Sequence, residues 1–124
     1  MSPYGFMQAE IVRLDAAVQL GDAEQTAKSL DYIREHRTDA PRTYQQALVL
    51  VHQSDTAADW LIELLEDRDQ RAAALLSVQD FASLPKTLRQ AELGSVRRAI
   101  VARPDVQEVI QKVGRIEKYN VGAP

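Results

Sequence analysis

Apolar residues in this chain recur every three or four positions, which is the period of one face of an α-helix. The first such series steps by four, three and four residues: Met7, Ile11, Leu14 and Val18. Alanine, leucine, glutamine and arginine, all good helix formers, are among the commonest residues of the chain. No segment demands a strand, and the one candidate is a short extended piece at 116–121. We therefore expect an all-α fold.

Helix boundaries are marked by glycine, aspartate and proline. Gly21 follows the first apolar series and suits a positive φ that ends a helix. Asp22, with Gln25 three residues later, has the spacing of an N-terminal capping box. Pro41 and Pro104 suit the first turn of later helices, because proline lacks the N–H that a first turn leaves unpaired.

Later boundaries are predicted by the same rules. Asp67, with Gln70 three residues on, repeats the capping spacing and predicts that a fifth helix opens there. Pro85 and Gly94 bracket one expected short helix, and a separate helix is expected over 95–102.

A two-part echo suggests internal repetition. The turn Leu20-Gly21-Asp22 is matched by Gln53-Ser54-Asp55, 33 residues later, and each turn lies between two amphipathic segments of helical length. One helical hairpin cannot bury its apolar stripe alone, so hairpins stack. We expect stacked antiparallel helical hairpins followed by short carboxyl-terminal helices. The alternative is an irregular helical bundle with a coincidental echo.

The chain is expected to form one helical domain over residues 1–124, since its length is ordinary for a single domain. Two hairpin repeats are predicted over 7–66, and packing helices over 67–114. Gly114 is predicted to end the last helix, which leaves 115–124 as a tail.

The hairpin pattern resembles the tetratricopeptide-repeat family. The segment Gln19-Leu20-Gly21-Asp22-Ala23-Glu24 is similar to that family's interhelical turn, and three apolar residues fall near its packing positions: Leu14, Leu30 and Ile33. Four positions depart from the family pattern: Glu10, Thr26, Ser54 and Trp60. The segments 102–106 and 112–115 resemble the tail of some bacterial proteins that contain these repeats.

The resemblance implies a binding site. In that family, the first helix of each hairpin lines a concave groove that holds a partner peptide or helix. Carried over through the turn, Asp15 and Gln19 line the groove in the first unit. Tyr44, Leu48 and His52 line it in the second. The expected function is non-catalytic binding of another protein or peptide through a helical groove.

Signals of catalysis are missing from the sequence. The chain has no cysteine, which excludes disulfides, thiolate metal sites and a cysteine nucleophile. His36 and His52 have no metal-ligand residue four positions later, and both are expected at helix ends. The glycines are scattered and form no phosphate-binding loop. We therefore predict that the protein is not an enzyme and that it holds no cofactor and no metal.

The charge and hydropathy patterns bear on partners and location. A net charge of −3 and the placement of Arg97 and Arg98 on adjacent helical faces argue against nucleic-acid binding. No apolar run approaches the roughly 20 residues that span a bilayer, and residues 1–7 lack a signal-peptide pattern, so we expect no membrane association and a cytoplasmic location. Homo-oligomerisation stays open.

A second function fits the same features. A small, acidic helical chain also suits an immunity or antitoxin-type inhibitor that neutralises a toxic effector enzyme. The sequence alone does not choose between this inhibitor and the interaction module.

Overall fold

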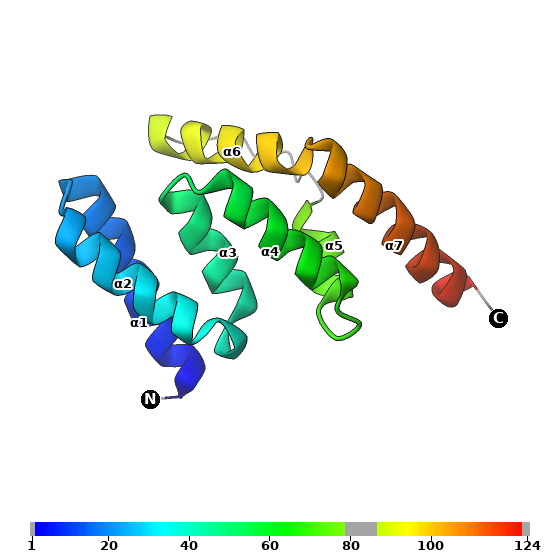
Figure 1. Ribbon diagram of the computed structural model, residues 1–124, viewed down its shortest axis with the longest axis horizontal. Helices are drawn as coiled ribbons and strands as arrows, with labels where there is room; N and C mark the ends of the chain where they lie inside the picture. The colour runs from blue at the N-terminus through cyan, green and yellow to red at the C-terminus, as the bar shows by residue number, and fades with distance from the viewer. Residues whose placement is uncertain (1, 79–86, 123–124) are drawn as a thin grey trace. The chain divides into compact units, whose positions relative to one another are not determined.

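A computed structural model describes residues 2–78 and 87–122, with side chains described over 2–78 and 87–114 (Figure 1). These residues form seven α-helices and one short 3-10 helix, η1, and contain no strand, so the expected all-α fold is confirmed. The elements are α1 (Pro3–Leu20), α2 (Ala23–Glu35), η1 (Arg37–Asp39), α3 (Pro41–Leu50), α4 (Ser54–Glu66), α5 (Arg71–Val78), α6 (Leu88–Val101) and α7 (Pro104–Gly122).

The helices divide into two compact units, Met1–Gln53 and Ser54–Pro124. The first unit contains α1, α2 and α3, and the second contains α4 to α7. The boundary falls at the turn of the second predicted hairpin, so the two helices of that hairpin belong to different units. The stacking of hairpins as repeats stays a prediction.

In the first unit, α1 and α2 lie side by side and α3 packs against both (Figure 1). Large apolar side chains from the first two helices are buried: Met7, Ile11, Leu14, Leu30 and Ile33. Each such side chain contributes about 1.5–3 kcal/mol through burial. Gln8 Nε2 on α1 also donates to Thr43 Oγ1 on α3 at 2.8 Å. This bond adds a polar tie between two helices that already share a core.

In the second unit, α4 packs against α5, α6 and α7. Its buried face consists of Ala57, Ala58, Leu61, Leu64 and Leu65. Ile100 on α6, with Val106 and Val113 on α7, is also buried. Arg71 Nε donates to the Leu65 carbonyl oxygen at 3.0 Å, which satisfies one of the carbonyls left unpaired at the end of α4.

The turn between α1 and α2 follows the sequence prediction. Gly21 has a φ of 70°, and its N–H donates to the Val18 carbonyl at 3.2 Å. The Asp22 N–H donates to the Ala17 carbonyl at 2.9 Å, which completes a Schellman motif. Asp22 Oδ1 then accepts from the Gln25 N–H at 3.0 Å and caps α2. Both boundary predictions are confirmed.

The end of α3 repeats this motif with a histidine in place of the glycine. His52 has a φ of 59°, and its N–H donates to the Val49 carbonyl at 3.1 Å. The Gln53 N–H donates to the Leu48 carbonyl at 2.9 Å. The structural counterpart of Gly21 is therefore His52, 31 residues later. The predicted match between Gly21 and Ser54 is wrong, because Ser54 is already the first residue of α4.

The predicted start of α5 at Asp67 is also wrong, since the helix begins at Arg71. Asp67 Oδ1 accepts from the Asp69 N–H at 2.9 Å, only two residues away. The carboxylate thus closes a local turn rather than capping a helix. Aspartate serves both roles, and a capping spacing alone does not distinguish them.

Two glycines predicted to break helices lie inside them. α6 runs unbroken through Gly94, so the separate helix over 95–102 is wrong. α7 continues past Gly114 to Gly122, so the predicted stop and the extended piece at 116–121 are wrong. Neither glycine has a positive φ. A helical glycine costs about 1 kcal/mol relative to alanine, so a single glycine does not by itself end a helix. Pro85 lies outside the described residues.

Substitution of Gly21 by alanine is expected to lower the free energy of unfolding by about 1 kcal/mol, because an alanine Cβ is strained at positive φ. No atom lies within 4 Å of a Cβ built at Gly21, so the cost comes from the backbone alone. Urea denaturation measures it. Gly94→Ala, within α6, is the control with the opposite sign. A Cβ at Gly94 would lie 3.3 Å from Arg98 Nη1, the end of an exposed side chain that can move aside, so the change should stabilise by about 0.5–1 kcal/mol. A Gly21→Ala chain as stable as the wild type would contradict this account of the turn.

Candidate protein-binding face

Helix α1 is apolar on two sides rather than one. One side carries the buried residues Met7, Ile11 and Leu14. The opposite side carries a second apolar series, which we call the outer face of α1: Gly5, Phe6, Ala9, Val12, Ala16 and Leu20. A helix at the surface of a globular protein normally presents polar residues on the side away from the core. The outer face departs from that rule.

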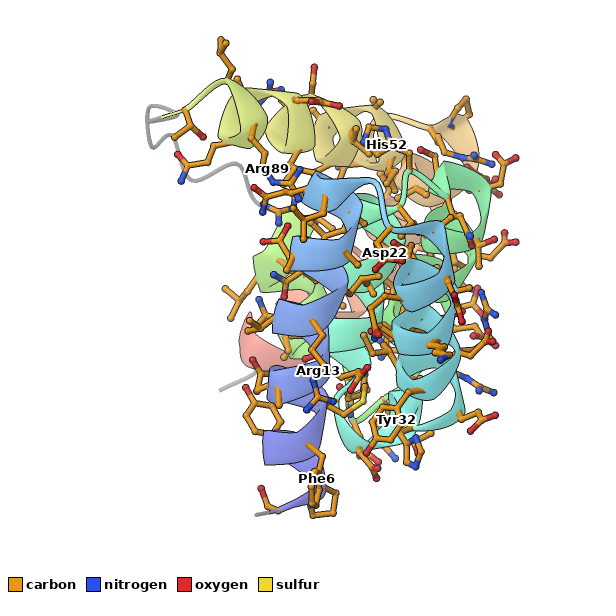
Figure 2. The ribbon with its side chains drawn as sticks, turned by 90° about the vertical axis from the view of Figure 1, so that its left-hand side faces the viewer. Phe6, Arg13, Asp22, Tyr32, His52 and Arg89 are labelled. Atoms are coloured by element: carbon orange, nitrogen blue, oxygen red, sulfur yellow. The ribbon has the colours of Figure 1, made fainter. Side chains whose placement is uncertain are left out.

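Large side chains on the outer face are open to solvent. Val12 is 67% exposed, Leu20 is 82% exposed and Phe6 is 49% exposed. Single exposed apolar residues are common, but a contiguous apolar group on one helix face is typical of interaction sites, which makes the outer face a candidate binding face. Figure 2 shows Phe6 and Arg13 on the same helix, with Phe6 nearer the amino end.

Charge on this part of α1 is largely balanced within the helix. Arg13 Nη1 lies 2.9 Å from Glu10 Oε2, and the Glu10 side chain is mostly buried whereas that of Arg13 is 66% exposed. Arg13 therefore compensates a carboxylate near the core while its own guanidinium stays at the rim of the outer face. The centre of the face carries no charge.

The outer face has the spacing of a helix-packing seam. Gly5, Ala9, Val12 and Ala16 are separated by four, three and four residues, which is the spacing of the a and d positions of a coiled coil. Three of the four residues are small, so the backbone of another helix can approach closely. The geometry therefore suits a helix rather than an extended peptide.

The predicted groove residues occupy very different environments. Asp15 and Gln19 lie on α1, half-buried and exposed respectively, and His52 is exposed just after α3. Tyr44 is 5% exposed and Leu48 is 0% exposed. Helices α1 and α3 pack against each other, so the five residues belong to neighbouring elements. The groove stays a prediction, with Tyr44 and Leu48 offering almost no surface to a partner.

The two histidines sit at helix ends. His36 follows α2, and its Nδ1 lies 2.8 Å from the Tyr32 carbonyl oxygen. Its ring stacks on that of Tyr32 with 4.2 Å between centroids. His52 occupies the left-handed position described above. Within the described ranges, no group of three or more histidine, cysteine, aspartate or glutamate residues is arranged to hold a metal ion.

An ion-pair cluster joins α4 to the start of α7. Arg103 Nη1 lies 2.6 Å from Asp55 Oδ1, while Nε and Nη2 donate to the two Asp105 carboxylate oxygens at 3.2 and 3.3 Å. The hydrogen bonds with Asp105 and then Asp55 raise the pKa of Arg103. The hydrogen bond with Arg103 lowers the pKa of Asp105 below its ordinary value of 3.8. This cluster holds two helix starts together.

Helix α4 also carries a row of exposed carboxylates at steps of four, four and three residues: Asp55, Asp59, Glu63 and Glu66. Residues three and four apart on a helix are neighbours, so these acids line one side of α4. The row gives the second unit an acidic surface.

Comparison with protein-family models, curated protein sequences and solved structures found no match for this chain. Across the described ranges, no helix combines the length and the apolar character needed to cross a membrane. We therefore infer the function from the residues themselves.

Sequence reasoning missed Phe6, Val12 and Leu20 as candidate binding residues. The signal for Val12 was present, because a second apolar series at 5, 9, 12 and 16 runs beside the series at 7, 11, 14 and 18; Phe6 and Leu20 lie outside that second series. A helix with two apolar stripes either is buried on both sides or offers one side to a partner.

Leu48→Ala is expected to lower the free energy of unfolding by about 2–5 kcal/mol, because truncation leaves a cavity at a fully buried position. Chemical denaturation measures the change. Gln19→Ala, on an exposed site, should stay within about 0.5 kcal/mol of the wild type. If Leu48→Ala lowers the free energy of unfolding by less than about 1 kcal/mol, Leu48 is not a core residue and the predicted groove position is favoured instead.

Arg103→Gln is expected to destabilise the second unit at neutral pH but not in strong acid. The depressed Asp105 pKa gives stability that is present above the unfolded pKa and is lost as pH falls through the folded pKa. Denaturation from pH 7 down to about pH 2 should show the wild-type and variant stabilities converging. The control is Arg98→Gln, which removes an arginine from an exposed position on α6. Gln107→Ala does not serve as a control, because Gln107 Nε2 donates to the Val101 carbonyl oxygen at 2.6 Å. A constant gap at every pH would contradict the ion-pair account.

Proposed function

We propose that this chain is a non-catalytic protein–protein interaction module that binds a helix of another protein chain. The observation that carries the proposal is the outer face of α1, where Phe6, Val12 and Leu20 expose apolar surface beside small residues. A helix is the matching ligand, because the seam has helical spacing and its small residues allow close approach. The exposed Gln19 and half-buried Asp15 adjoin this face on the same helix and supply polar contacts at its rim.

This proposal differs from the groove implied by the tetratricopeptide resemblance. It uses the outward side of α1 and leaves Tyr44 and Leu48 in the interior, where their burial stabilises the first unit. A cytoplasmic location and a non-enzymatic role belong to the same proposal. They are supported by the missing cysteine and by histidines that serve helix ends.

A second candidate is the inhibitor of a toxic effector enzyme. The acidic row of α4 favours it. Asp55 already pairs with Arg103, and the other exposed carboxylates of the row, Asp59, Glu63 and Glu66, complement a cationic substrate site on a target enzyme. In that case the second unit makes the main contact, and binding weakens as salt rises.

Val12→Arg is expected to abolish partner capture, because a charge placed in an apolar seam loses its hydration on binding. Arginine is a good helix former and Val12 is 67% exposed, so the fold should persist, as circular dichroism checks. Tagged wild-type and variant chains are incubated with lysate of the native host, and captured proteins are quantified by mass spectrometry. Recovery should drop at least tenfold with Val12→Arg.

Two further variants make this experiment decisive. Leu88→Arg alters a side chain that is 92% exposed on α6 and should leave capture unchanged. Asp59→Lys combined with Glu63→Lys reverses two of the four charges of the acidic row. If that pair abolishes capture while Val12→Arg does not, the inhibitor replaces the helix-binding module. Capture that survives both changes would overturn both candidates.

A further inference from the structure

We propose that the helix bound by the outer face of α1 belongs to a second copy of this chain, with the two α1 helices packed antiparallel about a two-fold axis. This inference rests on the proposed function, because it names the occupant of the same face. It commits to a particular pairing of residues, which an experiment can test separately.

The seam is complementary to itself when one helix is reversed. Its steps of four, three and four residues read the same in both directions. In an antiparallel pair, Gly5 therefore faces the partner's Ala16, and Ala9 faces the partner's Val12. The same two contacts recur on the other side of the axis, which is the isologous arrangement of a two-fold dimer. Each of these facing pairs contains at least one small residue, so no two bulky side chains oppose each other along the seam.

The rim residues are also matched in this register. Phe6 and Arg13 flank the seam on one side at a spacing of seven residues, so they lie one heptad apart. When the helices are antiparallel, Phe6 lies beside the partner's Arg13, and a guanidinium stacks favourably on an aromatic ring. Arg13 can keep its 2.9 Å pair with Glu10, which belongs to its own helix.

The opposite rim contributes a polar match. Gln8 and Asp15 flank the seam there, again seven residues apart. The antiparallel register sets Gln8 beside the partner's Asp15. The Gln8 amide nitrogen donates one hydrogen to Thr43 Oγ1 at 2.8 Å, so its second hydrogen is the donor to the partner's carboxylate. No like charges face each other on either rim. In a parallel pair the stack of Phe6 on the partner's Arg13 is lost, so the rims favour the antiparallel arrangement.

The dimer is expected to be weak and reversible. One helix face from each chain, built largely of small residues, buries less than the roughly 1,200 Å² that marks stable interfaces. Association is therefore expected in the micromolar range rather than the nanomolar range. It must be sought at high protein concentration.

Sedimentation equilibrium is measured on the wild-type chain from about 5 μM to about 500 μM, which brackets this range. A monomer–dimer equilibrium is expected. Val12→Arg should raise the dissociation constant at least tenfold, and Leu88→Arg should leave it unchanged. A chain that stays monomeric throughout would overturn the second copy as the occupant. The proposed function would still stand if Val12→Arg abolishes capture of a different host protein.

Cross-linking tests the register, and the chain has no native cysteine to interfere. Gly5→Cys and Ala16→Cys variants with different mass tags are mixed and treated with a thiol cross-linker about 8 Å long. Antiparallel pairing predicts product only between the two variants, since identical positions then lie about 16 Å apart along the axis. Like-with-like products from each variant alone would show parallel pairing and overturn the proposed register. A dimer that Val12→Arg leaves intact would overturn the assignment to the outer face of α1.

Discussion

The burial of one side of α1 against α2 and α3 decides which residues the first unit offers to a partner. Both sides of this helix are apolar, so its rotation about its own axis is not fixed by polarity alone. Along the middle of the helix, Met7, Ile11 and Leu14 are larger than the residues of the seam, in which Val12 is the one residue that is not small. Burying the larger side removes more apolar area from water and is the more favourable choice. The bond from Gln8 to Thr43 then holds that rotation.

Boundaries that depend on a few neighbouring residues were predictable from the sequence. The stop at Gly21 and the cap at Asp22 are local, and each is satisfied by hydrogen bonds within a few residues. The same reasoning failed at Gly94 and Gly114, where the glycine lies within the helix and has no positive φ. It failed again at His52, which ends α3 in the left-handed conformation. Histidine adopts this conformation less readily than glycine, so its presence in the sequence does not indicate the end of a helix.

The candidate site was harder to predict than the fold class. Helical periodicity is a property of each segment alone, so the all-α fold followed from it directly. Whether Tyr44 and Leu48 face a groove or the interior depends on how α3 is oriented among its neighbours, which no local pattern encodes. The outer face of α1 is visible as a second apolar series, but its exposure depends on which of two series the core takes. That choice follows from comparing side-chain sizes, a step that periodicity does not include.

An exposed apolar face normally carries a risk of uncontrolled association, and the symmetry of this seam limits that risk. Two self-complementary faces that meet about a two-fold axis cover each other completely, so the pair closes and leaves no free seam for a third chain. If the face matched a different surface of the same molecule, each added chain would leave one such face and one such surface exposed, and chains would keep adding to form a filament. The small residues of the seam also keep the buried area low, which makes the contact reversible. The reversed spacing of Gly5, Ala9, Val12 and Ala16 thus favours a limited, exchangeable pair over open-ended growth.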